Sequence, residues 1–230
     1  MSKYIIMSDE KPEINESIEK LGFEIIQSDN IEGLLPFERR HADIQCLRVN
    51  DTFFILKEAK KLKEKLLSSG LNTAEIDEEI ADEYPQNVLL NAVYMNNSLY
   101  CKTDSVAKVV KKYCESNNIE IINVNQGYTK CSTAVLGNCF ITADKGIFDA
   151  MSRNGEEGLL IDSGDIELDG VDYGFIGGCT FYHKGKTYFT GDITQHKSFK
   201  IIKEFLSDRN IKIKCLSNRK LYDIGGFIVI

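Results

Sequence analysis

The stretch YDIGGFIVI, Tyr222–Ile230, decides the fold because it is an apolar, β-branched strand at the C-terminal end of the sequence. A chain end usually frays unless another segment holds it, and an unpaired apolar edge strand promotes aggregation. We therefore expect this strand to have a partner. The best candidate is YIIMSD, residues 4–9, at the opposite end of the sequence.

A repeated pattern of strands and helices supports this pairing. A strand rich in β-branched and aromatic residues ends in an acid, a helix follows, and a second strand runs up to a turn. The acids recur at a spacing of roughly 45 residues. They are Asp9, Glu58, Asp104, Asp144 and Asp192. The unit after Glu58 is irregular, with two expected helices, at 57–69 and 73–83, and no clear strand before residues 88–94.

Hairpins precede four of the five acids, and their turns contain Asn, Gly or Asp, as hairpin turns require. Only Asp9 lacks a preceding arm, and Tyr222–Ile230 supplies one. The sequence thus predicts an α/β fold of five ββαβ units, closed into a ring by pairing of the N- and C-terminal strands. The alternative is an open α/β sheet in which the last strand is interior.

Composition narrows the classes of function. The 230 residues are 43% hydrophobic and 27% charged, and they fit one globular domain, residues 1–230. A net charge of −7 argues against a nucleic-acid partner. No apolar run is long enough for a membrane span, and no signal peptide is apparent. Seven cysteines without a CxxC pair indicate reduced thiols and a cytoplasmic location. No motif for a metal or another cofactor occurs, so none is expected.

Three short stretches carry residues suited to chemistry: HADIQC at 41–46, TKCSTAV at 129–135 and LLIDSGDIELDG at 159–170. Together with the five-unit ring, they resemble the pentein fold of the guanidine-modifying enzyme superfamily, which includes arginine and agmatine deiminases, dimethylarginine dimethylaminohydrolases and amidinotransferases. Within that superfamily, the chain is most similar to a mainly clostridial group without an assigned activity.

The resemblance implies roles for particular residues. His41 would be the general acid/base, and Cys131 would be the nucleophile. Asp43, with Asp162 or Asp165, would bind the cation. The match requires a rotated unit order, because the enzymes carry their nucleophile near the C-terminus, where this chain has GGFIVI.

Equivalent places in the repeat suggest which side chains face the ring centre. A count of 13 residues back from the last four acids reaches, in order, Gln45, Asn91, Cys131 and Cys179. We therefore expect Asn91 beside Cys131 in a central pocket, and Cys179, in the context GGC, is the alternative nucleophile. Asp223, which precedes Gly225 and Gly226, is either a turn residue or a further ligand for the cation.

Each of these residues also has a purely structural interpretation. Free cysteines are usually core residues, Asp162 and Asp165 can terminate a strand, and His196 is expected on a helix surface. Two functions therefore stay open. One is a cysteine-dependent hydrolase or amidinotransferase acting on a small guanidino compound. The other is a non-catalytic pentein that binds a small ligand or a protein partner.

Overall fold

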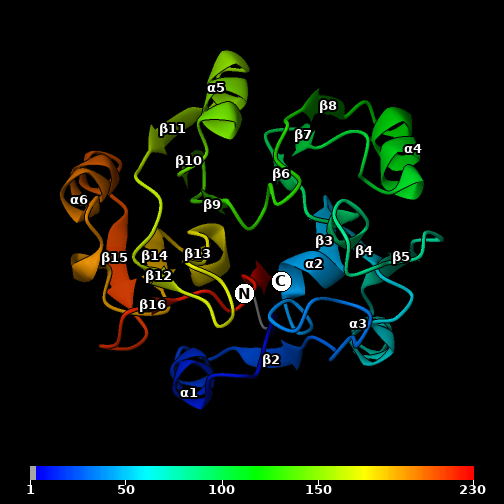
Figure 1. Ribbon diagram of the computed structural model, residues 1–230, viewed down its shortest axis with the longest axis horizontal. Coiled ribbons are helices and arrows are strands. Elements are labelled where there is room, and N and C mark those ends of the chain that lie inside the picture. The colour runs from blue at the N-terminus through cyan, green and yellow to red at the C-terminus, as the bar shows by residue number, and fades with distance from the viewer. Residues whose placement is uncertain (1–3) are drawn as a thin grey trace.

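Five three-stranded sheets surround a common centre in the structure, a computed structural model that describes residues 4–230 (Figure 1). In one unit, β3 (Cys46–Val49) pairs antiparallel with β4 (Thr52–Ile55). Then α3 (Lys60–Ser68) crosses to β5 (Asn72–Glu75), which pairs parallel with β4. The first strand of each unit lies near the centre and the helix lies at the rim. This architecture confirms the predicted five ββαβ units.

Three further units repeat the same order. Their elements are β6 (Val93–Met95), β7 (Ser98–Cys101), α4 (Lys108–Ser116) and β8 (Glu120–Asn123); β9 (Thr133–Val135), β10 (Cys139–Thr142), α5 (Lys145–Arg153) and β11 (Glu157–Leu160); and β13 (Thr180–His183), β14 (Lys186–Phe189), α6 (Phe199–Asp208) and β15 (Lys212–Cys215). Each helix packs one apolar face inward, as Ile147 and Met151 of α5 illustrate. Asp144 caps α5 by accepting a hydrogen bond from the Ile147 backbone N.

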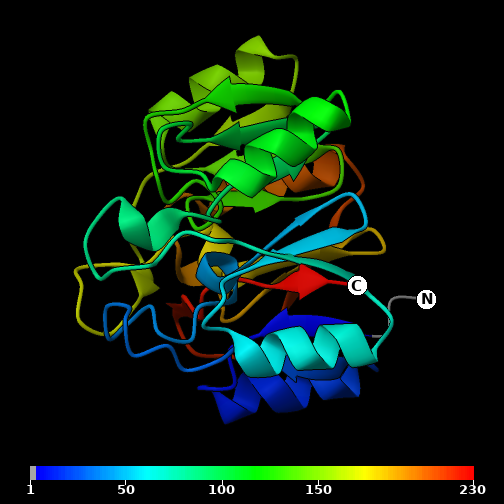
Figure 2. The same ribbon diagram turned by 90° about the vertical axis from the view of Figure 1, so that its right-hand side faces the viewer.

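The fifth unit contains both ends of the chain, which close the ring. It comprises β1 (Tyr4–Met7), α1 (Pro12–Lys20), β2 (Glu24–Gln27) and β17 (Ile228–Val229). Strand β17 pairs antiparallel with β1, with Ile5 opposite Val229 and Ile6 opposite Ile228 (Figure 2). The Ile230 backbone N donates a 2.9 Å hydrogen bond to the Tyr4 carbonyl. The predicted pairing of the terminal strands is confirmed, and the open-sheet alternative is excluded.

One element differs from the expectation. Residues 73–83 do not form a second helix, because β5 occupies their first part and the rest is irregular up to the short helix η1 (Gln86–Val88). The open edge of β4 offers a parallel partner to Asn72–Glu75. Hydrogen bonding to that edge outweighs the weak helical pattern of a polar segment, as tertiary context often does.

A small additional sheet positions the loop at the mouth of the candidate site. Strand β12 (Ile166–Glu167) pairs parallel with β16 (Leu221–Tyr222). The Asp223 backbone N then donates to the Glu167 carbonyl. This pairing holds the loop that follows β12 beside the segment that leads into β17.

The structure also describes the state of the cysteines and the length of the helices. All seven cysteines, each within the described residues, are free thiols, and only Cys215 is exposed. No helix within residues 4–230 combines the length and apolar character that a membrane crossing requires.

Candidate active site

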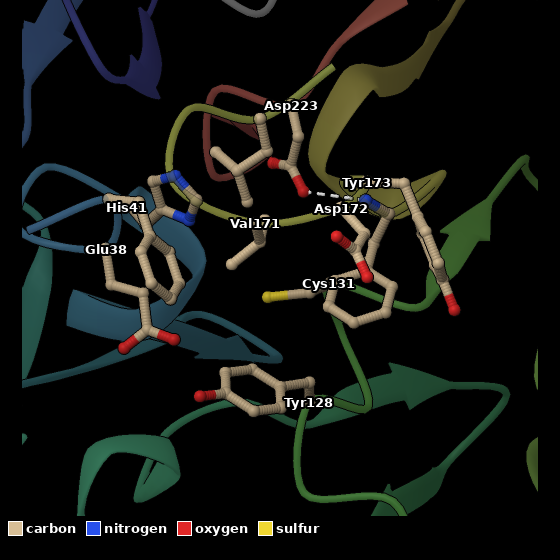
Figure 3. Close-up of a pocket in the computed structure, with 11 residues that line it drawn as sticks. Glu38, His41, Tyr128, Cys131, Val171, Asp172, Tyr173 and Asp223 are labelled. Atoms are coloured by element: carbon tan, nitrogen blue, oxygen red, sulfur yellow. Dashed lines mark hydrogen bonds between the residues drawn. The ribbon is translucent and has the colours of Figure 1, made fainter. Parts of the chain in front are cut away.

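A cavity of about 290 Å³ opens where segments of several units meet (Figure 3). His41 immediately precedes the short helix α2 (Ala42–Gln45), Cys131 lies in the turn before β9, and Asp223 follows β16. All three line this cavity, and the Cys131 sulfur points into the space between the surrounding side chains. The ring therefore brings together three residues that lie 90 or more positions apart, roughly two repeat lengths for each neighbouring pair.

Glycines allow these segments to approach closely. A Cβ added to Gly225, which has a φ of +76°, would lie 2.3 Å from the Cα and Cβ of His41. A Cβ added to Gly178, in the short helix η2 (Gly177–Cys179), would lie 1.8 Å from the Asp223 Oδ1 atom. The GG pairs at 177–178 and 225–226 thus make room for the candidate site, which is a use of glycine that sequence reasoning did not assign.

The Cys131 thiol is buried, with 3% of the residue exposed. The Asn91 Nδ2 atom lies 2.9 Å from the Cys131 sulfur, and the Asn91 Oδ1 atom accepts hydrogen bonds from the Lys130 and Cys131 backbone N atoms. Burial, followed by the charges of Asp43 and Asp223, raises the pKa of the Cys131 thiol well above its ordinary value, whereas the Asn91 amide opposes the increase. The thiol of the free protein is therefore protonated at neutral pH.

Asp43 lies behind Cys131 rather than in the wall of this cavity. It is 1% exposed, and the residue lines a separate cavity together with Lys130. Burial raises the pKa of Asp43 to about 7; the charge of His41 opposes this increase, and the charge of Asp223 adds to it. Asp43 can therefore exchange a proton near neutrality beside Cys131. The predicted contact of Asp43 with a cation stays a prediction.

Asp223 supplies the buried carboxylate at the floor of the cavity. Its two oxygens accept 2.8 Å hydrogen bonds from the backbone N atoms of Gly225 and Phe175. A carboxylate has about four acceptor sites, so two bonds leave capacity for a ligand. Asp223 thus acts as a turn residue through its bond to Gly225 and also lines the cavity; its role as a ligand for a cation stays a prediction.

The other predicted site residues lie elsewhere. Asp162 lines an adjacent cavity and accepts a hydrogen bond from the Ser198 hydroxyl, and Asp165 accepts one from the Lys197 backbone N. Neither lines the Cys131 cavity. Cys179 is fully buried and donates to the Ile176 carbonyl, so the alternative nucleophile has no access to this cavity.

Two further expectations need correction. The Gln45 amide turns away from the centre to bond the backbone of Asp29 and Arg39. His196, expected on a helix surface, is 2% exposed and lines the adjacent cavity, because the short helix η3 (Ile193–Gln195) ends there and α6 begins only at Phe199.

Sequence reasoning missed several wall residues. Glu38 is 2% exposed, and it accepts a hydrogen bond from the Asn87 amide. Asp172 lies at the exposed mouth, in the loop that follows β12. The rings of Tyr128 and Phe175 are stacked, with centroids 6.0 Å apart. All four lie in loops without periodicity, and only the turn composition of residues 169–174, DGVDYG, indicated a loop there.

The ring fold is also found in solved structures. DDAH from Pseudomonas aeruginosa, a mutant complexed with citrulline, matches with a TM-score of 0.60 and 10% identity over 100% of both chains. The inosamine-phosphate amidinotransferase from Streptomyces griseus matches with a TM-score of 0.58 and 12% identity over 98% of this chain and 91% of that one. The N-terminal domain of a cyanobacterial arginine dihydrolase, ArgZ, matches with a TM-score of 0.60 and 10% identity over 99% and 95%. The chain therefore has the pentein fold.

Within that fold class, the chain belongs to the family described as "Family of unknown function (DUF6873)", whose model matches residues 5–228. No curated protein matches the sequence. Within residues 4–230, no group of three or more His, Cys, Asp or Glu side chains is placed to hold a metal ion.

Proposed function

We propose that this protein is a cysteine-dependent hydrolase or amidinotransferase that acts on a small guanidino compound. The observation that carries the proposal is the meeting of Cys131, His41 and Asp223 in one cavity. A thiol, a titratable imidazole and a buried carboxylate are the groups that nucleophilic attack on a guanidinium requires.

The reaction would proceed in two balanced steps. Cys131 gives its proton to His41, and the sulfur bonds to the central guanidinium carbon. His41 returns the proton to the departing nitrogen as the carbon–nitrogen bond breaks, which leaves a thiouronium on Cys131. Water, or an acceptor amine, then loses a proton to His41 and attacks the same carbon. The carbon–sulfur bond breaks, and His41 gives its proton to the sulfur, which restores the thiol. A ureido product also loses one proton to water, whereas a guanidine product stays protonated. A ureido compound or a new guanidine is released.

The raised pKa of Cys131 fits a substrate-assisted version of this chemistry. Burial first, and then the charges of Asp43 and Asp223, raise the pKa of the thiol and keep it neutral in the free protein. A guanidinium bound to Asp223 adds a positive charge beside the sulfur, and an adjacent positive charge favours the thiolate. The Cys131 thiol would therefore ionise when the substrate binds.

The second candidate is a pentein that binds a small cation without converting it. The deep burial of Cys131 and the two carboxylates that hold its thiol protonated favour this function. In this case Asp223 and His41 would recognise the ligand, and the thiol would be an inert wall residue.

Turnover and thiol reactivity separate the two candidates. A panel of guanidines is incubated with the protein and assayed for ureido product and for released ammonia or amine. In parallel, iodoacetamide labelling is followed against pH with and without each guanidine. Cys131→Ser is the test variant, and Cys179→Ser, which alters a buried thiol outside the cavity, is the matched control.

The enzyme is supported by product formation that Cys131→Ser and His41→Ala abolish and Cys179→Ser preserves, with ligand lowering the pKa of Cys131. Binding without product and without a change in labelling supports the second candidate. Absence of both binding and product across the panel would refute a guanidino ligand altogether.

A further inference from the structure

The charges that line the Cys131 cavity point to a narrower class of ligand. Its wall contains three carboxylates, those of Glu38, Asp172 and Asp223, and no Lys or Arg of the described chain lines it. His41 is the one lining residue that can become cationic. The two arginines that precede His41 in the sequence bond outside the cavity: Arg39 donates to the Leu34 carbonyl, and Arg40 pairs with Asp9.

The acids are spread from the floor to the mouth. Asp223 and Cys131 are 1% and 3% exposed, whereas Asp172 belongs to an exposed loop at the mouth of the cavity. Glu38 is fixed in the wall by the Asn87 amide. A linear ligand with its guanidinium at Cys131 would therefore extend toward Asp172.

The walls between these acids are apolar and aromatic. Phe37, Leu168 and Val171 join the stacked rings of Tyr128 and Phe175. Such walls suit an alkyl spacer, and aromatic faces also attract cations. The volume of about 290 Å³ is at the lower end of ligand pockets, so the ligand is small.

Apart from His41, which the proposed function assigns to the reacting centre, no residue that lines this cavity within the described chain could pair with a carboxylate on the ligand. Such a carboxylate would lie among carboxylates of the same charge, and such like-charge juxtaposition disfavours binding. Building on the proposed function, we infer that the cavity selects guanidino compounds without a carboxylate and favours those with a second cation at the far end, which would meet Asp172.

A matched set of three ligands tests this inference. Agmatine is arginine without its carboxylate, and N-butylguanidine lacks both the carboxylate and the amine. Calorimetric titration with the full chain, and with Cys131→Ser to prevent turnover, gives the three affinities. We expect agmatine to bind at least about tenfold more tightly than arginine, with N-butylguanidine between them.

Variants at the mouth sharpen the test. Asp172→Asn should weaken agmatine binding by about two- to fivefold, the range for an exposed charge pair, and Asp172→Lys should reverse the preference toward arginine. Asp51→Asn removes the same charge from a fully exposed side chain that does not line the cavity, and it should change neither affinity.

Arginine binding as tightly as agmatine, or an affinity ratio unchanged in Asp172→Lys, would overturn this inference while leaving the guanidino function intact. Failure of all three guanidines to bind would overturn the proposed function, and the inference with it.

Discussion

Gly178→Ala tests whether glycine is required to assemble the candidate site. The added Cβ would lie 1.8 Å from Asp223 Oδ1 and 2.3 Å from Asp223 Cγ. Either η2 shifts, as in an overpacked core at about 1–3 kcal/mol, or the carboxylate moves and loses hydrogen bonds from Phe175 and Gly225, each bond to a charged group being worth about 1.5–3 kcal/mol. We expect a loss of about 2–4 kcal/mol in the free energy of unfolding.

Urea and thermal unfolding, followed by circular dichroism, measure this loss. For a chain of this size, a loss of that magnitude lowers Tm by roughly 4–16 °C. Gly33→Ala is the matched control, because its Cβ would make only ordinary 3.8 Å contacts with Ile80, and it should change stability by less than about 0.5 kcal/mol. Gly178→Ala should also weaken binding of the guanidine that proves tightest. A variant as stable as Gly33→Ala, with unchanged binding, would show that Asp223 is not confined as described.

Three further predictions concern the buried charges and the ring closure. The pKa of Asp43 is about 7 in the folded protein, whereas the ordinary value of an Asp carboxyl is 3.8. Ionisation of Asp43 therefore lowers the free energy of unfolding as pH rises from about 4 to 7. Asp43→Asn should thus gain up to about 4 kcal/mol over the parent across that window in urea titrations, and a gain independent of pH would contradict this explanation. Asp223→Asn should lower the pKa of Cys131 and speed its iodoacetamide labelling at pH 7, so unchanged or slower labelling would remove Asp223 as a cause of the raised pKa. Removal of residues 227–230 should expose the edge of β1 and produce aggregation in light scattering, whereas a monomer with an unchanged Tm would show that the β1–β17 pair is dispensable.

The fold was largely predictable because its decisive features are local in sequence. The chain repeats hairpins whose turns contain Asn, Gly or Asp, and an acid follows the middle strand of each unit. One hairpin strand, Tyr222–Ile230, had no neighbouring partner in sequence, and this predicted its pairing with the strand at 4–9. Segment 72–75, NTAE, was missed because it forms an outer strand, partly exposed, so it lacks an apolar pattern. Only its pairing with β4 makes it a strand.

The candidate site was predictable in part. The repeat brought Asn91 and Cys131 to equivalent places, and the structure has them in contact. The repeat pattern could not show that Asp43 lies outside the wall of the Cys131 cavity, because the position of Asp43 depends on how α2 packs against residues 225–226. Glu38 and Asp172 reach the cavity through loops, whose paths follow from long-range contacts rather than from local periodicity.

The segment that closes the ring also carries Asp223 at the floor of the cavity. Closure of the ring and formation of the cavity therefore occur together. During synthesis, β1 is made before β17, and the two paired strands are more than two hundred positions apart. Contacts of such sequence separation form slowly. As long as residues 222–230 are still inside the ribosome, neither Asp223 nor the glycines beside it can reach His41, so we expect the nascent chain to have no ligand pocket at that stage.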